Sequence, residues 1–291
     1  MTLLENSLII LSTLVLAIGF GLSVRSLLAP LHEGLKRALV FNGIGFVLLA
    51  GAFAVDLAAR PELPLSTMRA SMLLFGLILL AVSSVMTYAA GSLLLNVLSA
   101  PVVILLQLLS LFFDRWPASE AGMQTFGATI TTIHIALFLV SYAFLIIAAG
   151  FSAMFLVMDH LLKEKAYSPV FFKLPGLTRL DTYAYWSALA GLGVLTGGIA
   201  LALVSARAAS AVVPAPLGFD FTIIGTLVVW AYYAAYVLMR IRLRIPARRA
   251  ALVGVCGLAI VLAVYFFSKM WGPTGIHGFG VTERASAGAP R

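Results

Sequence analysis

Uncharged apolar runs of about 20 residues recur along this chain, and no other feature restricts its possible folds as strongly. A helix of roughly 20 apolar residues crosses the hydrocarbon core of a bilayer. The sequence therefore predicts an all-α fold, a polytopic transmembrane bundle of about eight helices. The predicted helices cover residues 7–28, 38–58, 69–89, 93–113, 127–158, 183–206, 221–241 and 249–269.

The distribution of basic residues predicts the orientation of the bundle. With the N-terminus outside, twelve of the nineteen Lys and Arg residues fall in inner loops. Because Lys and Arg favour the cytoplasmic side, both termini are expected to face away from the cytoplasm. The net charge of +8 is then a topology signal, so the expected surroundings are the lipid of a bacterial inner (cytoplasmic) membrane and not nucleic acid. The inner residues are Arg25, Lys36, Arg37, Lys163, Lys165, Lys173, Arg179, Arg240, Arg242, Arg244, Arg248 and Arg249.

The chemistry-bearing residues do not form an enzyme-like set. The single cysteine, Cys256, excludes a disulfide framework and is expected to be a small buried hydrophobe. The sequence contains no catalytic triad, phosphate-binding glycine loop or metal-ligand spacing, so we expect no enzyme. Asn42, Asn96 and Gln107 are the strong polar groups within the first four helices, and no charged residue is expected at a midplane.

The four histidines divide between the two sides of the membrane. His32 and His160 fall on the inner side, where solvated positions are expected. His134, two turns into the fifth predicted helix, and His277, after the eighth, share the outer side. Two neutral imidazoles can hold a haem iron axially. The alternative is that these two histidines are unrelated.

The segments around these histidines resemble a known family. The chain reads TTIHIALFLVSYAFLIIAAGFSAMFLV around His134, then LPGLTRLDTYAYWSALAGLGVLTGGIAL, and KMWGPTGIHGFG around His277. These segments resemble the cytochrome c assembly family, the haem-handling membrane proteins of the CcsA, CcmC and HemX type, and most closely its HemX branch. The resemblance runs from about residue 127 to 280. It implies haem b as cofactor, with His134 and His277 as the metal ligands and Asp220, Trp230 and Trp271 beside them.

One part of the family pattern is degenerate in this chain. The family usually carries a tryptophan-rich outer loop, of the form WGxxWxWD, between the two histidines. Asp220 matches the family aspartate, but Leu217 and Phe219 stand where the nearer tryptophans would be. Trp230 matches a tryptophan in the helix that follows. That helix lacks the histidine of the CcsA type, so passage of haem across the bilayer is not expected of this chain alone.

The predicted organisation is a four-helix half at residues 1–126, a cytochrome c assembly-like half at 127–280 and a short polar tail at 281–291. Four glycines in the sixth predicted helix, Gly191, Gly193, Gly197 and Gly198, are expected to let neighbouring helices approach closely. The expected function is haem handling or c-type cytochrome maturation, with other membrane subunits or an apocytochrome c as partner. The alternatives are a haem-free subunit or regulator of a respiratory or haem-biosynthesis complex and, more remotely, a small-molecule transporter.

Overall fold

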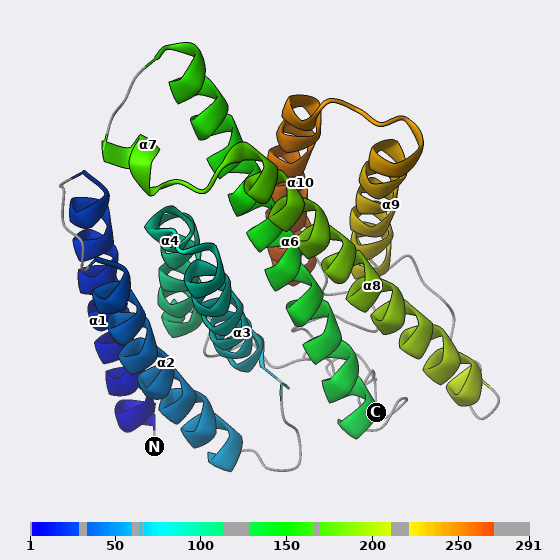
Figure 1. Ribbon diagram of the computed structural model, residues 1–291. Coiled ribbons are helices and arrows are strands. Elements are labelled where there is room, and N and C mark those ends of the chain that lie inside the picture. The colour runs from blue at the N-terminus through cyan, green and yellow to red at the C-terminus, as the bar shows by residue number, and fades with distance from the viewer. Residues whose placement is uncertain are drawn as a thin grey trace, which may run out of the picture.

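The computed structural model of the 291-residue chain describes residues 2–28, 34–59, 65, 67–112, 128–165, 169–210 and 221–270. This part of the chain is α-helical, and eight of its helices are long and apolar enough to cross a membrane. The prediction of an all-α transmembrane bundle is therefore confirmed. The helices are α1 (Thr2–Leu28), α2 (Gly34–Ala59), α3 (Met68–Ala90), α4 (Leu93–Phe112), α6 (Ala128–Lys163), α7 (Pro169–Lys173), α8 (Leu177–Ser210), α9 (Phe221–Arg242) and α10 (Ala247–Met270) (Figure 1).

The connection between α6 and α8 is shorter than the sequence suggested. We expected a loop from Asp159 to Asp181, but both residues lie within helices and the short helix α7 occupies part of the connection. At 1.5 Å per residue, the 36 residues of α6 extend about 54 Å, well beyond a hydrocarbon core of about 30 Å. The polar inner end of α6 therefore projects from the bilayer.

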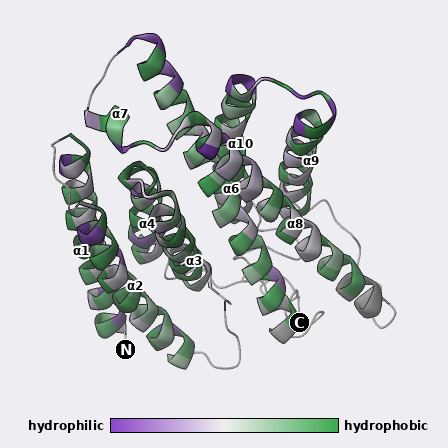
Figure 2. Cartoon of the chain, in the orientation of Figure 1, coloured by the Kyte–Doolittle hydropathy of each residue, from purple (hydrophilic) through white to green (hydrophobic). Residues whose placement is uncertain are grey.

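The helices form two groups that share an apolar core. Helices α1 to α4 lie together, and α6, α8, α9 and α10 form the second group (Figure 1). The largest cluster of buried apolar side chains includes Phe75 of α3, Leu106 of α4, Ile147 of α6 and Tyr265 of α10. Most residues along the helices are hydrophobic (Figure 2), and many large apolar side chains are exposed, as expected where the solvent is lipid. The two groups thus pack as one bundle.

Amide side chains connect the helices of the first group. Asn42 of α2 donates a hydrogen bond to the Oδ1 atom of Asn96 at 2.8 Å, and Asn96 donates to Ser23 Oγ of α1 at 3.1 Å. Gln107 of α4 donates to Ser12 Oγ of α1, also at 3.1 Å. All five side chains are buried. The interior polar residues recognised in the sequence therefore join helices, as polar groups commonly do within membranes.

Two of the four glycines of α8 permit a close helix contact. A Cβ atom on Gly191 would lie 2.6 Å from Leu145 Cδ2 of α6, and one on Gly198 would lie 3.3 Å from Phe138 Cε2. Gly193 and Gly197 have no such neighbour within 4 Å. The packing prediction is thus confirmed for Gly191 and Gly198 and wrong for the other two, which lie on the exposed face of α8.

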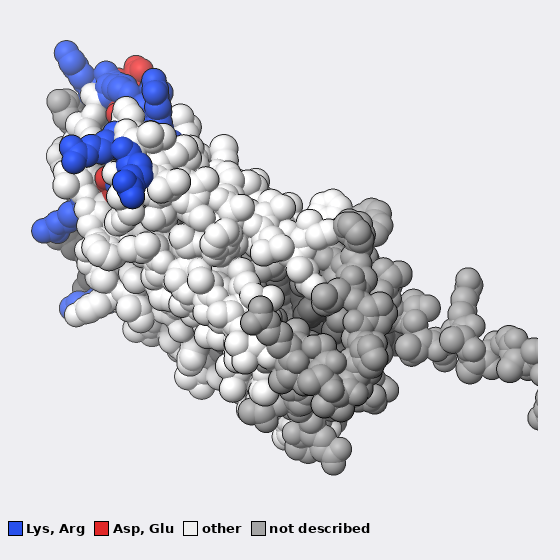
Figure 3. All heavy atoms as spheres, turned by 90° about the vertical axis from the view of Figure 1, so that its right-hand side faces the viewer, with Lys and Arg blue, Asp and Glu red and all other residues white. Residues whose placement is uncertain are grey.

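Basic side chains gather at one end of the bundle, and the long apolar body carries almost none (Figure 3). This end contains the α1–α2, α3–α4, α6–α8 and α9–α10 connections, whereas α1 begins and α10 ends at the other. Apart from Arg69, which is buried, the Lys and Arg side chains that the structure describes all belong to this basic end. This is the distribution that the positive-inside rule predicts for the inner side of a membrane protein.

Cys256 differs from its expected environment. It lies in the middle of α10, but its side chain is exposed on the helix surface instead of buried in the core. An apolar run gives no periodic signal for the buried face when every face of the helix is hydrophobic, because both lipid and core accept apolar side chains.

Candidate functional site around His134

His134 lies near the outer end of α6, about 9 Å along the helix axis from its first residue. The side chain is half-buried, and its Nδ1 atom lies 3.2 Å from the carbonyl oxygen of Gly198 on α8. A carbonyl oxygen can only accept, so Nδ1 carries the proton in this contact. In the neutral imidazole the lone pair is then on Nε2, the nitrogen that can bind a metal ion.

The ring of Phe138 also contacts the imidazole of His134. Phe138 is one helical turn further along α6, and its ring meets that of His134 at a centroid distance of 4.5 Å and an angle of 72°. Such an edge-to-face arrangement is a favoured aromatic geometry. Phe138 also packs on Gly198, where the absence of a Cβ atom leaves room for the ring. Two residues, Gly198 and Phe138, thus constrain the orientation of His134.

Trp230 contacts the same segment of α8 from another direction. Its Nε1 atom donates to Thr196 Oγ1 at 3.0 Å, and the indole is 38% exposed. Thr196 and Gly198 are two residues apart, so their Cα atoms lie about 200° apart around the helix axis, and Thr196 is exposed whereas Gly198 is buried. The LTGG segment therefore bonds Trp230 of α9 through one face and His134 of α6 through the opposite face.

The SYA segment of α6 forms part of the same helix contact. Ser141 is completely buried and donates to the carbonyl oxygen of Gly191 at 2.8 Å. Tyr142 and Ala143 are also buried in the core. The Ser141–Gly191 hydrogen bond joins α6 to α8 about two helical turns from His134. This contact keeps the imidazole aligned with its partner, the Gly198 carbonyl group.

The segment that begins α8 contributes an ion pair at the inner end. The two carboxylate oxygens of Asp181 lie 2.6 and 2.7 Å from the two terminal nitrogens of Arg240 on α9. The guanidinium group of Arg240 also lies 5.5 Å from the centre of the Tyr185 ring. A bidentate pair with a stacked aromatic ring suits arginine specifically. This motif aspartate therefore joins α8 to α9, far from His134.

Several predicted site residues lie outside the part of the chain that the structure describes. They are His277, Asp220 and Trp271, and the inner-side His32 lies outside it too. His160 is exposed near the inner end of α6, as predicted. Within the described residues no group of three or more His, Cys, Asp or Glu side chains could hold a metal ion. His134 is thus the predicted ligand whose surroundings the structure defines.

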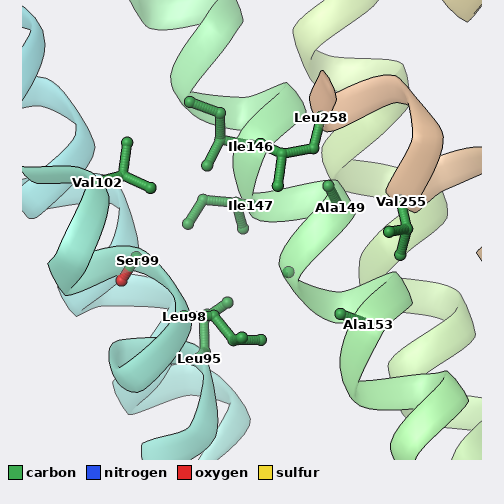
Figure 4. A pocket seen from close by; sticks show the side chains of 11 residues that line it. Leu95, Leu98, Ser99, Val102, Ile146, Ile147, Ala149, Ala153, Val255 and Leu258 are labelled. Atoms are coloured by element: carbon green, nitrogen blue, oxygen red, sulfur yellow. The ribbon is translucent and has the colours of Figure 1, made fainter. Parts of the chain in front are cut away.

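A small apolar cavity lies deeper in the bundle (Figure 4). It is bounded by α4, α6 and α10, and its volume is about 80 Å³. Pockets that enclose cofactor-sized ligands have volumes of roughly 300–1,000 Å³. The nearest lining residue of α6, Ile146, is about 18 Å from His134 along the helix. The cavity is therefore too small and too remote to hold a porphyrin bound by His134.

A buried ionic group at the outer end of the first four helices was missed by the sequence reasoning. Arg69 of α3 has no exposed surface and pairs with Glu5 of α1 at 2.6 Å. Arg69 also donates to Asn6, and Asp56 of α2 is buried as well. In the sequence, Asp56 and Arg69 lie at the ends of the predicted helices 38–58 and 69–89, where charged side chains commonly face water. The available signal was that each falls within a helix-length apolar run, where charges are rarely solvated.

The fold and the site together define a class of protein: a polytopic membrane protein that holds an oriented imidazole near the outer ends of its helices. The chain belongs to the Cytochrome C assembly protein family, whose sequence profile matches residues 65–277. This match begins in the connection to α3, earlier than residue 127, where the motif resemblance starts.

Two relatives are named Protein HemX. The protein from Brevibacillus brevis is 24% identical over 226 residues, which cover 75% of this chain and 82% of the relative. The protein from Bacillus subtilis (strain 168) is 25% identical over 137 residues, which cover 47% of this chain and 49% of the relative. The similarity to the HemX type that the motifs indicated is therefore confirmed.

Proposed function

We propose that this protein is a non-enzymatic haem-binding protein of the bacterial cytoplasmic membrane that takes part in haem handling or in the maturation of c-type cytochromes. His134 would supply one axial ligand to haem b and His277 the other. The observation that carries the proposal is the hydrogen bond between His134 Nδ1 and the Gly198 carbonyl oxygen. Metal-binding histidines usually donate a hydrogen bond from their second ring nitrogen to a carbonyl or carboxylate oxygen in this way.

The surroundings of His134 suit a porphyrin. The surface of α6 near its outer end is apolar, because Ile130 and Ile133 are both exposed there. An apolar helix surface can face the porphyrin plane while Nε2 meets the iron. When bound, haem b would supply a redox-active iron whose potential depends on its axial ligands. The protein's own contribution is to hold the imidazole, keep one tautomer and exclude water.

Partners are proposed from the family alone. A member of a cytochrome c assembly family would act with an apocytochrome or with other membrane subunits. Because the tryptophan-rich pattern before Asp220 is degenerate, we expect a partner that supplies the missing part of the outer surface. The haem-free alternative, a subunit or regulator of a larger membrane complex, rests on the same loop, where Leu217 and Phe219 replace tryptophans.

An absorption spectrum of the purified protein tests the proposal. Protein extracted in mild detergent and supplied with haem b should show a low-spin Soret band. The band should be lost in the His134→Ala, His277→Ala double variant and altered in each single variant. His160→Ala is the matched control, because His160 is exposed near the opposite end of α6. A bis-imidazole spectrum that survives in the double variant would contradict the site, and stable co-purification with a partner without any haem would favour the alternative.

A further inference from the structure

The contact between α6 and α8 around His134 is built from residues that carry no chemistry of their own. Gly198 is buried, and the carbonyl oxygen that it contributes lies 3.2 Å from His134 Nδ1. A Cβ atom on Gly198 would lie 3.3 Å from Phe138 Cε2, which is a tight contact, and 3.6 Å from Leu137 Cβ, which is an ordinary one. A side chain larger than a methyl group at this position would therefore have to displace Phe138 or separate the two helices.

The Phe138 ring contacts both Gly198 and His134. Its centroid lies 4.5 Å from that of the imidazole, so a displacement of the phenyl ring from the Gly198 side is passed on to His134. A side chain added at residue 198 would press Phe138 toward the imidazole and push α8 away from α6. Both displacements lengthen or misalign the Nδ1 hydrogen bond, which weakens steeply once its geometry departs from the optimum.

We propose that Gly198 and Phe138 are positioning residues that select the Nδ1–H tautomer of His134 and present Nε2 as its metal-binding nitrogen. The expected effect on haem affinity rests on the proposed function, whereas the effect on the tautomer of His134 does not. The tautomer of His134 is a property of the haem-free protein. It can be measured whether or not the chain binds haem.

The neighbouring glycine provides a matched control. Gly197 is exposed, and a Cβ atom there would have no neighbour within 4 Å. Gly198→Val and Gly197→Val therefore make the same chemical change in the same helix, one residue apart. Only the first change adds atoms between α8 and the His134–Phe138 pair.

The first measurement is the nitrogen-15 spectrum of haem-free protein labelled at histidine, with the His134 signals assigned from His134→Ala. The wild type and Gly197→Val should show one protonated nitrogen, Nδ1, and one unprotonated nitrogen, Nε2. Gly198→Val should show mixed tautomers. Should Gly198→Val fail to fold, Phe138→Leu adds no atoms and should average the two nitrogen signals, whereas Phe172→Leu on the exposed face of α7 should leave them unchanged.

The second measurement is haem affinity by titration of the Soret band. Loss of a group that orients a metal-binding histidine typically lowers affinity 10- to 100-fold, so Gly198→Val should bind haem about that much more weakly than Gly197→Val. Equal tautomer spectra in the two glycine variants would overturn the positioning role, even if haem binds. A wild type that takes up no haem but shows the single tautomer would support the positioning role and contradict the proposed function.

Discussion

Glu5 Oε1 lies 2.6 Å from Nε of Arg69, and the two side chains are 6% and 0% exposed. Glu5 belongs to the first turns of α1 and Arg69 to the beginning of α3, so the pair joins two helices at the outer end of the bundle. Charges this deeply buried are costly to desolvate, and the structure tolerates them because they meet each other. The pair therefore links the beginning of α1 to the beginning of α3.

Breaking this ion pair should strongly destabilise the protein. Glu5→Gln removes the carboxylate charge that lies 2.6 Å from the buried guanidinium group, and breaking a buried ion pair typically costs about 3–5 kcal/mol of unfolding free energy. Thermal unfolding of the purified protein in detergent should show the loss. The control is Lys163→Gln, which removes the exposed i,i+4 pair with Asp159 and should change stability by less than about 0.5 kcal/mol.

Replacing both residues separates the cost of removing the Glu5 charge beside Arg69 from the net contribution of the pair. The double variant Glu5→Gln, Arg69→Met removes the guanidinium group as well, so it should be more stable than Glu5→Gln alone. If the two variants unfold at the same temperature, the ion pair does not determine the stability of this end of the bundle.

The hydrogen bond between Asn42 and Asn96 should contribute measurably to the packing of the first four helices. Each single change to Ala removes one amide from a buried contact of 2.8 Å. Double-mutant cycles within membrane proteins give about 0.6 kcal/mol for such a bond, with a maximum of about 1.7. A cycle of Asn42→Ala and Asn96→Ala should give a coupling energy in this range. Ser7→Ala is a suitable control, because the Ser7 hydroxyl bonds within its own helix on an exposed face.

Hydropathy was sufficient to predict the transmembrane helices of this chain. Each predicted span overlaps a helix of the structure, since a bilayer demands a continuous apolar run and a fully bonded backbone. Hydropathy could not distinguish core from lipid, because both accept apolar side chains. For this reason the sequence did not reveal that Cys256, Gly193 and Gly197 are exposed.

The candidate site was only partly predictable. Motif resemblance selected His134, but sequence gives no information on the carbonyl oxygen of Gly198, because main-chain partners are independent of residue type. The buried pairing of Arg69 was equally hidden. Whether a charge at the end of a helix faces water or another helix depends on how the helices pack, and that is a long-range property. The sequence singled out Trp230 and His134, but it did not reveal that they contact opposite faces of α8.

The orientation of the bundle can be tested with the chain's single cysteine. Cys256 is about 14 Å along α10 from its inner end, so a charged maleimide should not reach it. A Cys256→Ser background should then allow Leu3→Cys, at the exposed beginning of α1, to be labelled by an impermeant maleimide in intact spheroplasts. Lys165→Cys should be labelled only after lysis. Labelling in the reverse order would contradict the assignment of the basic end to the cytoplasm.

Gly191 and Gly193 offer a direct test of helix approach between α6 and α8. A methyl group on Gly191 would lie 2.6 Å from Leu145 Cδ2 and 3.2 Å from the main-chain oxygen of Ser141, so the Leu145 side chain must shift and the contact with the α6 main chain becomes tight. Overpacking of this kind typically costs about 1–3 kcal/mol, and here it also lengthens the Ser141 hydrogen bond. Gly193→Ala meets nothing within 4 Å and should be neutral or stabilising by up to about 1 kcal/mol, because alanine restricts the unfolded chain. Unfolding temperatures of the two alanine variants measure the difference.

Gly191 precedes Gly198 by two helical turns on the same contact between α6 and α8. Gly191→Ala should therefore also disturb the His134 tautomer, whereas Gly193→Ala should leave it intact.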